Sequence, residues 1–517
     1  MIHLCLAKMS ETGMEQKYIQ EAFDTQWVAP LGPNVNAFEK NLEDFINCHL
    51  DQTSSPCHLD HPTCHFERSR EISEISPCAS LSRDDKGNML SRNDMGLSRD
   101  DKALSKRVVA LSNGTAAVHL ALIACGVGPG DEVIVQSFTF CASSHPVTYL
   151  GATPVFVDSE PETWNIDPDL LEEAIKDRIA KTGKKPKAIV PVALYGMPYD
   201  QDRIMDIANR YEIPVIEDAA EGFGSRYKGQ VLGTAGRYGV LSFNGNKMIT
   251  TSGGGALICK DKTDWDKIMW LATQARESYP YYQHETIGYN YRMSNICAGI
   301  GRGQMTVLNA HIAHHHHVQA LYEQLLADVP GITVHTQPTC HLDQASCHFE
   351  RSRALELCSL ATGGTQEISE ISPCASLSRN DMGNSRDDKV YDSNYWLTTI
   401  TLDPALKVKG QENAYKQMVT GAVGGAAGVI HTASTPVTDC QPNDNVEAMR
   451  LALLAAGIES RPLWKPMHKQ PVYRHSPAYV NGVSEGLFKV GMCLPTGPCV
   501  TDEQVAYIAN TIKASIL

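Results

Sequence analysis

The chain of 517 residues lacks long apolar runs and has fewer basic than acidic residues. It has no run of about 18 apolar residues, which argues against a transmembrane helix. Lys and Arg total 45 against 59 Asp and Glu, giving a formal net charge of −14. This acidic balance argues against nucleic acid as the main ligand, because phosphate contacts need a basic surface. The first residues are too weakly apolar for a signal peptide, so we expect a cytoplasmic protein that binds neither membrane nor nucleic acid.

The sixteen cysteines do not indicate a disulfide framework. The chain is far longer than a small stapled scaffold, and it shows no secretory signal. Eight of the cysteines lie in or beside two segments of unusual composition. The other eight are scattered singly and are predicted to be reduced thiols.

The two unusual segments, residues 57–102 and 340–389, are near-copies of each other. Both contain the blocks CHFERSR and EISEISPCASLSR. They are rich in Ser, Arg and Asp and lack a sustained apolar period, so we predict flexible loops inserted twice into a host domain. Two copies so far apart do not make a solenoid. A low-complexity stretch from Thr420 to about Asp444 is a candidate for a further insertion.

Two groups of side chains raise the question of a metal. Each repeat copy holds two Cys-His pairs seven residues apart, which could supply ligands for tetrahedral zinc. The spacing matches no usual zinc motif, and duplication explains the second copy, so we predict no metal. A second group, His311 and His314–His317, falls on a predicted helix. There we favour a solvated helix surface over a metal site, since no cysteine or carboxylate lies nearby in the sequence.

Outside the repeats, apolar runs alternate with amphipathic segments, which predicts an α/β fold. Continuous Val and Ile runs between helices indicate a mostly parallel sheet buried on both faces. We expect strands over 108–112, 132–137, 154–158, 188–194, 214–218, 239–243 and 256–259, and helices over 15–23, 115–124, 169–179, 199–211 and 312–326. After the second repeat we expect a strand over 395–401 and helices over 446–456 and 502–515.

These elements predict the domain organisation. Residues 103–310 form a large α/β domain, and residues 390–517 form a small C-terminal α+β domain. A helix within 311–339 connects the large domain to the second repeat, and the N-terminal segment 1–56 packs on the core.

Three features follow predicted strands, at the sheet edge where open α/β sheets bind ligands. The first is Ser112-Asn-Gly-Thr115, between a strand and a helix. Its glycine lets backbone N–H groups approach an anion such as phosphate, helped by the helix dipole. A tight connection without a ligand is the alternative.

The second and third features are an acid and a lysine. Asp218 ends a strand and could cap a helix, lie on the surface or hold a protonated pyridine nitrogen. Lys247 lies in a polar, glycine-rich stretch and could be a solvated charge or form a Schiff base with an aldehyde cofactor. Together with the phosphate cradle, these are the groups that pyridoxal 5'-phosphate (PLP) needs. Ser137-Phe-Thr-Phe140 offers an aromatic ring to stack on it.

The sequence resembles the DegT/DnrJ/StrS family of PLP-dependent nucleotide-sugar aminotransferases. The resemblance is carried, in order, by LSNGTAAVHLAL, GDEVIVQSFTFCASSHPVTYLGATPVFVD, IEDAAEGFGSRYKG, GVLSFNGNKMITTSGGGAL, GYNYRMSNICAGIGRGQM and ESRPLWKPMH. It implies the PLP-dependent transferase fold type I, which is aspartate-aminotransferase-like.

The resemblance also implies roles for single residues. Lys247 is implied to bond to the cofactor and shuttle a proton, and Asp218 to pair with the pyridine nitrogen. The other implied cofactor contacts are Phe140 stacked on the ring, Gly114, Thr115 and Ser242 at the phosphate, Glu221 beside the ring oxygen, and Asn290 reaching the phosphate from a neighbouring subunit. The last implies a homodimer with shared active sites. Arg461 and His468 are candidate substrate contacts, with a purely structural role as the alternative.

The implied reaction is transfer of an amino group from L-glutamate to the C4 ketone of a nucleotide sugar. We expect UDP-4-keto-6-deoxy-N-acetylglucosamine as the acceptor, with GDP-4-keto-6-deoxymannose second. Three alternatives remain: a homologue impaired by the insertions, a non-catalytic regulator on the same scaffold, and a protein that acts through its repeats.

Overall fold

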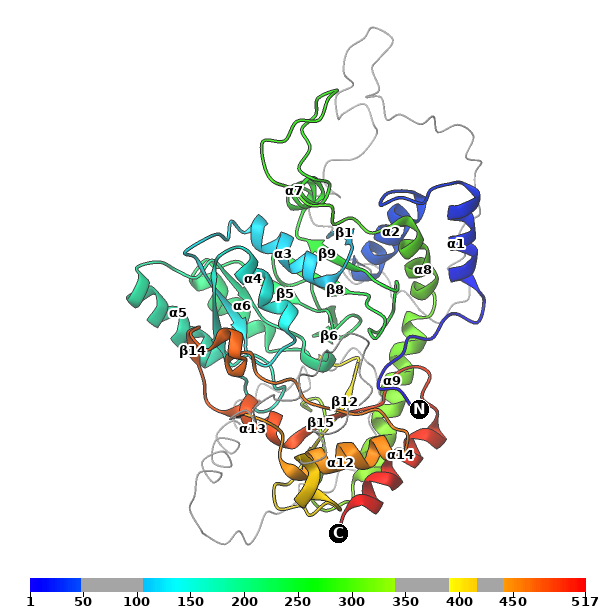
Figure 1. Cartoon of the computed structure of the whole chain (residues 1–517). Helices are drawn as coiled ribbons and strands as arrows, with labels where there is room; N and C mark the ends of the chain where they lie inside the picture. The colour runs from blue at the N-terminus through cyan, green and yellow to red at the C-terminus, as the bar shows by residue number, and fades with distance from the viewer. Residues whose placement is uncertain (48–105, 340–389, 416–439) are drawn as a thin grey trace. The chain divides into compact units, whose positions relative to one another are not determined.

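A long, mostly parallel sheet forms the centre of the larger domain in the computed structural model, which describes residues 1–47, 106–339, 390–415 and 440–517 (Figure 1). Two four-stranded sheets, in the orders β1-β9-β8-β5 and β14-β3-β2-β4, are linked by parallel bridges from Ile189 to Val215 and from Val192 to Asp218. The strands are β1 (Arg107–Leu111), β2 (Glu132–Gln136), β3 (Thr153–Val157), β4 (Ala188–Val190), β5 (Ile216–Asp218), β8 (Tyr238–Ser242), β9 (Gly255–Cys259) and β14 (Ala478–Tyr479).

Strand β9 is antiparallel to both of its neighbours, whereas the other described pairings in this sheet are parallel. The predicted mostly parallel sheet is therefore confirmed. Except for the short edge strand β14, which is partly exposed, the strands are almost fully buried, as expected for a sheet covered on both faces.

Helices cover both faces of this sheet. On one face α3 (Gly114–Ala124) and α7 (Lys262–Ala272) pack on apolar strand residues, and on the other α5 (Pro168–Thr182) and α6 (Gln201–Arg210) do so. Helix α5 begins one residue before its predicted range, where Asp167 caps it by accepting the amides of Asp169 and Leu170. The short helix α4 (His145–Tyr149) and the 3-10 turn Cys141–Ser143 follow β2.

The N-terminal helices α1 (Met14–Asp24) and α2 (Pro33–Asn47) pack beside α8 (Asn295–Met305) (Figure 1). Helix α2 contributes Val35, Phe38 and Leu42 to a core cluster that also contains Phe243. Helix α1 comes so close to α8 that a Cβ on Gly303 would lie 2.6 Å from Glu15 Cγ. Helix α2 covers the sheet edge at β1, where Glu39 and Glu43 accept the amides of Ala110 and Val108.

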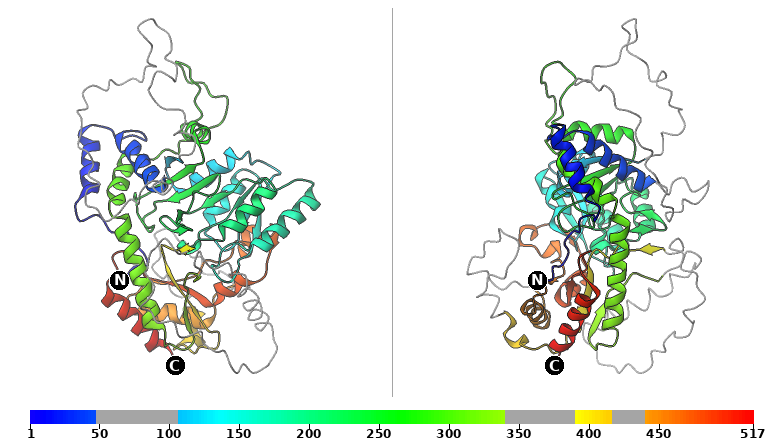
Figure 2. Two further views of the ribbon diagram at one scale, coloured as in Figure 1. Left: turned by 180° about the vertical axis from the view of Figure 1, so that it is seen from behind. Right: turned by 90° about the vertical axis from the view of Figure 1, so that its right-hand side faces the viewer.

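The small domain is an antiparallel sheet with helices on it. The long helix α9 (Leu308–Leu326) runs from the larger domain to this sheet (Figure 2). The sheet has the order β10 (Ile332–Val334), β12 (Thr398–Leu402), β15 (Gly491–Leu494) and β13 (Arg461–Pro462), and the helices are α12 (Asp444–Ala455), α13 (Val483–Val490) and α14 (Asp502–Ser515). The α+β class predicted for this domain is confirmed. A three-stranded sheet is formed by β6 (Arg226–Tyr227), β7 (Gln230–Val231) and β11 (Tyr391–Asp392).

The histidines of α9 correct one prediction. His311 and His315 are 5% and 0% exposed, so the solvated surface predicted for them is wrong. The ring nitrogen Nδ1 of each faces a backbone carbonyl, that of Met248 at 3.2 Å and that of Tyr395 at 3.0 Å. His317 does lie on the exposed side, 2.9 Å from Asp502.

Several other expectations concern features that the described residues show only in part. Within the described ranges, no three metal-binding side chains gather at one point, and no helix is long and apolar enough to cross a membrane. Seven of the scattered cysteines are free thiols: Cys5, Cys125, Cys141, Cys259, Cys297, Cys493 and Cys499. The two repeats with their Cys-His pairs, and most of the low-complexity stretch after Thr420, lie outside the described residues.

Candidate active site

A cavity of about 310 Å³ opens where α3 begins and where β5 and β8 end. Side chains from the small domain, Trp396 and Trp464, form part of its wall. Seven of the predicted site residues line this one cavity: Gly114, Thr115, Phe140, Asp218, Glu221, Ser242 and Lys247.

The first turn of α3 forms an anion-binding end of the cavity. Asn113 precedes the helix in an extended conformation and accepts the amide of Ala116 at 2.7 Å. The amides of Gly114 and Thr115 lie in the first turn, where a helix offers no internal acceptor and its dipole favours negative charge. A Cβ on Gly114 would lie 3.2 Å from Ser242 Cβ, so glycine lets α3 approach β8 closely. This arrangement suits a phosphate.

Asp218 forms an acidic wall of the same cavity and is 5% exposed. Its Oδ1 accepts the amide of Ala220 at 3.1 Å, and its Oδ2 accepts the hydroxyl of Ser143 at 2.7 Å. Burial raises the pKa of Asp218, while the bonds from Ser143 and Ala220 and the charge of Lys247 oppose that rise. The carboxyl group is thus oriented and ready to pair with a protonated ring nitrogen.

Sequence reasoning missed Ser143 and, behind it, Thr139. The two hydroxyls lie 2.8 Å apart and continue the chain of hydrogen bonds from Asp218. Both belong to the quoted stretch around Phe140, and Ser143 ends a 3-10 turn that begins at Cys141. A short polar residue three positions after Phe140 was the feature of the sequence that could have pointed to Ser143.

Lys247 reaches the cavity with its amine between an acid and an aromatic ring. Its Nζ lies 3.6 Å from Glu221 Oε1 and 4.0 Å from the centre of the Trp396 ring. Glu221 is held from behind, since its Oε2 accepts the amide of Tyr195 at 2.8 Å. Burial raises the pKa of Glu221, and the charge of Lys247 counteracts it. Trp396 was not predicted, because nothing near Tyr395–Thr401 in the sequence indicates that it lies against a lysine 149 positions earlier.

Phe140 is 52% exposed and lies at the mouth of the cavity, with its ring 5.8 Å from that of Trp464. A planar ligand ring between Asp218 and Lys247 would bury this exposed aromatic surface. The position agrees with the predicted stacking role, which stays a prediction.

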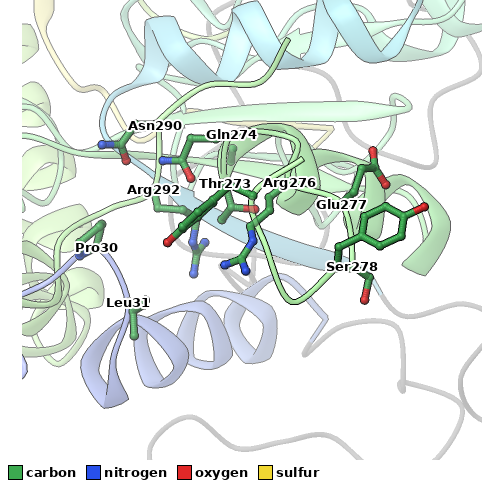
Figure 3. Close-up of a pocket in the computed structure, with 12 residues that line it drawn as sticks. Pro30, Leu31, Thr273, Gln274, Arg276, Glu277, Ser278, Asn290 and Arg292 are labelled. Carbon is green, nitrogen blue, oxygen red and sulfur yellow. The ribbon is translucent and has the colours of Figure 1, made fainter. Parts of the chain in front are cut away.

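Three predicted site residues lie away from this cavity. Asn290 lines a second cavity of about 600 Å³ together with Arg276 and Arg292 (Figure 3). His468 has its Nδ1 2.7 Å from the hydroxyl of Ser137, and the exposed Arg461 donates to Glu459 at 3.0 Å. The roles of these three residues also stay predictions.

The sequence pattern of the DegT/DnrJ/EryC1/StrS aminotransferase family matches residues 101–354 and 413–513. The chain belongs to this family. It is 34% identical to "Putative pyridoxal phosphate-dependent aminotransferase EpsN" of Bacillus subtilis, over 97% of this chain and 92% of that protein. It is 30% identical to GDP-perosamine synthase of Escherichia coli O157:H7, over 98% and 96% of the two chains.

Solved structures support the fold. A family aminotransferase from Brucella abortus superposes with a TM-score of 0.65 at 21% identity, covering 97% of this chain and 95% of that one. The PLP form of a sugar aminotransferase from Streptococcus pneumoniae gives 0.64 at 20% identity, covering 99% and 97%. The predicted fold type I is confirmed, and the chain is a PLP-dependent aminotransferase.

The residues of the cavity fit PLP. The N-terminus of α3, which Gly114 allows to lie close to β8, can bind the phosphate. The buried, hydrogen-bonded carboxyl group of Asp218 can pair with the ring nitrogen. The amine of Lys247, in the same cavity, can bond to the aldehyde.

Proposed function

We propose that this aminotransferase moves an amino group from L-glutamate to the C4 ketone of a nucleotide-linked 4-keto-6-deoxy sugar. The donor leaves as 2-oxoglutarate, and the ketone becomes an amine. The observation that carries the proposal is similarity to GDP-perosamine synthases along nearly the whole chain, at 30% and 29% identity for two of them.

Each cavity residue has a proposed task. PLP supplies the electron sink that makes the α-hydrogen of the donor acidic. Lys247 Nζ takes that proton and returns it, because it is the basic amine inside the cavity. Asp218 keeps a proton on the ring nitrogen, and the first turn of α3 with Ser242 binds the phosphate. The rings of Phe140 and Trp464 shield the reacting atoms from water.

Two sugars compete as the acceptor. The sequence resemblance favours UDP-4-keto-6-deoxy-N-acetylglucosamine. The curated relatives favour GDP-4-keto-6-deoxymannose, since a third GDP-perosamine synthase, from Caulobacter vibrioides, is 36% identical over 61% of this chain. Neither is singled out by a described side chain, so both belong in the assay.

We also propose a homodimer with shared active sites. Asn290 lies outside the cavity of its own Lys247, which supports a role toward a neighbouring subunit. The segment before it exposes Tyr281, Tyr282 and Ile287 at 59%, 78% and 81% (the Asn290 cavity is drawn in Figure 3). Apolar groups this exposed on one segment are typical of an interface.

The test is a half-reaction followed by a full one. The purified protein is mixed with PLP, the visible absorption is recorded, and L-glutamate is added without sugar. We expect the band of the lysine-bound cofactor to disappear while 2-oxoglutarate forms, one molecule for each lysine-bound cofactor lost. Each keto sugar is then added separately, and the aminated product is identified by mass spectrometry.

Lys247→Ala is the decisive variant. We expect it to lose the lysine-bound band and all turnover, because no other described amine lines the cavity. Turnover at the normal rate in this variant would refute the assignment. If the wild-type protein binds PLP but does not react with L-glutamate, glutamate is not the donor.

A further inference from the structure

The turn that carries Lys247 has little side-chain packing of its own. Asn244, Gly245 and Asn246 are exposed, and the turn closes with a bond from the Lys247 amide to the Asn244 carbonyl at 3.0 Å. Its backbone is held instead through the carbonyls on either side of the lysine. Asn246 O accepts the indole N–H of Trp396 at 2.6 Å, and Met248 O faces His311 Nδ1 at 3.2 Å.

Trp396 is itself held in a demanding conformation. The preceding residue, Tyr395, has φ 48°, a left-handed value that a bulky residue rarely adopts. Its carbonyl faces His315 Nδ1 at 3.0 Å. His315 at the carbonyl and Asn394, which accepts the Trp396 amide at 2.8 Å, together hold the peptide that directs the Trp396 ring, 1% exposed, against the lysine amine.

The two histidines act from one face of α9. They are four residues apart, about one helical turn, and both are buried. A carbonyl can only accept, so each Nδ1 must carry the hydrogen. Burial lowers the pKa of both rings, that of His315 to about 3, so neither adds a positive charge beside the lysine.

Helix α9 spans the two domains at this point. Leu308 and Ile312 belong to the core cluster of Met248 and Phe243, whereas Val318 and Tyr322 belong to the core of the small domain. His311 lies within the first set of anchors, and His315 lies between the two sets. The histidine pair ties one side of the lysine turn and the peptide of Trp396 to the same rigid element.

We propose that His311 and His315 are positioning residues, which hold the Lys247 turn and the Trp396 ring so that the amine points into the cavity. The proposal rests on the proposed role of Lys247.

The test compares matched pairs of variants in the full chain. His311→Leu and His315→Leu remove the N–H donor, whereas His311→Asn and His315→Asn keep an N–H near the position of Nδ1. His317→Leu, on the exposed side of the same helix, is the control. Trp396→Phe removes the donor to Asn246 O but keeps an aromatic ring against the lysine.

The readout is formation of the bond between Lys247 and PLP. The apo form of each variant is mixed with PLP, the visible band is followed in time, and the bond is trapped with borohydride and located by mass spectrometry. We expect both Leu variants and Trp396→Phe to form the bond about tenfold to a hundredfold more slowly, because a misplaced nucleophile loses its near-attack geometry. The Asn variants should recover most of the rate, and His317→Leu should match the wild type.

Three outcomes would overturn the inference. They are wild-type rates in the Leu variants, equal slowing in the Leu and Asn variants, and an equal effect of His317→Leu. If a Leu variant fails to fold, as judged by circular dichroism, Trp396→Phe and the Asn variants still decide the question. Failure of the proposed role of Lys247 looks different, since wild-type protein would then form no bond to PLP at Lys247, and a wrong donor or sugar would leave that bond intact.

Discussion

At the residue scale, the charge of Asp218 depends on Ser143. The carboxyl group is buried, which raises its pKa, and the Ser143 hydroxyl bond is the largest influence that lowers it again. Only the carboxylate pairs with a protonated ring nitrogen. The share of protein able to do so falls as the pH drops through the pKa of Asp218.

Ser143→Ala should therefore raise the pKa of Asp218 further. We expect PLP to bind about tenfold more weakly near neutral pH, from the loss of one hydrogen bond to a charged group. The decline of affinity at falling pH should begin at a higher pH than in the wild type. The measurement is the Kd of PLP as a function of pH. Ser144→Ala is the matched control, because the Ser144 hydroxyl donates to Cys141 O instead; an equal shift there would contradict the prediction.

At the element scale, the position of α3 depends on Gly114, which has no side chain to keep the helix away from β8. The close approach of Gly114 to Ser242 brings the helix N-terminus to the end of β8. An added Cβ at 3.2 Å must push the helix or the serine away, and either change opens the phosphate cradle.

Gly114→Ala should weaken PLP binding by about tenfold, the equivalent of one charge-assisted hydrogen bond. Pyridoxal, which lacks the phosphate, should bind as it does to the wild type. Comparing the two Kd values by fluorescence titration checks this. Gly128→Ala is a suitable control, since nothing lies within 4 Å of its added Cβ and its φ is not in the left-handed range. A parallel loss of pyridoxal binding would mean that α3 serves the whole cavity and not the phosphate alone.

The elements show what sequence could predict. Asp218 and Lys247 follow apolar strands, and strand ends meet at one edge of a sheet, so their meeting was foreseeable. The antiparallel direction of β9 was not, because a buried strand has the same apolar pattern in either direction. The burial of His311 and His315 was not either. Histidine is a polar residue. Its burial is possible here because each ring N–H bonds to a backbone carbonyl of a distant segment, that of Met248 or of Tyr395.

At the scale of the whole molecule, the N-terminal segment is joined to the rest by a buried ion pair. Glu39 on α2 lies against Arg292, whose side chain is only 7% exposed, and Glu39 also accepts the amide of Ala110 on β1 at 2.7 Å. Arg292 in turn donates to Ala110 O at 3.0 Å. This arrangement connects α2, the first strand of the sheet and the segment that carries Asn290, which are far apart in the chain.

Glu39→Gln should therefore destabilise the whole fold and not only its first helices. Gln keeps an oxygen for the Ala110 amide but leaves the Arg292 charge buried without its counter-charge. We expect the free energy of unfolding to fall by about 2–4 kcal/mol, near the lower range for breaking a buried pair. The measurement is denaturant unfolding followed both by circular dichroism and by the visible band of bound PLP.

Asp266→Asn is the control, because it breaks an ion pair with Lys262 in which both side chains are exposed, at 53% and 50%. It should lower the free energy of unfolding by less than about 1 kcal/mol. If Glu39→Gln costs no more than this control, burial of the pair does not govern its contribution. If the circular dichroism signal of Glu39→Gln falls at a lower denaturant concentration than the visible band of bound PLP, α2 unfolds before the cofactor site. The N-terminal segment would then cover the sheet edge at β1 without supporting the PLP cavity.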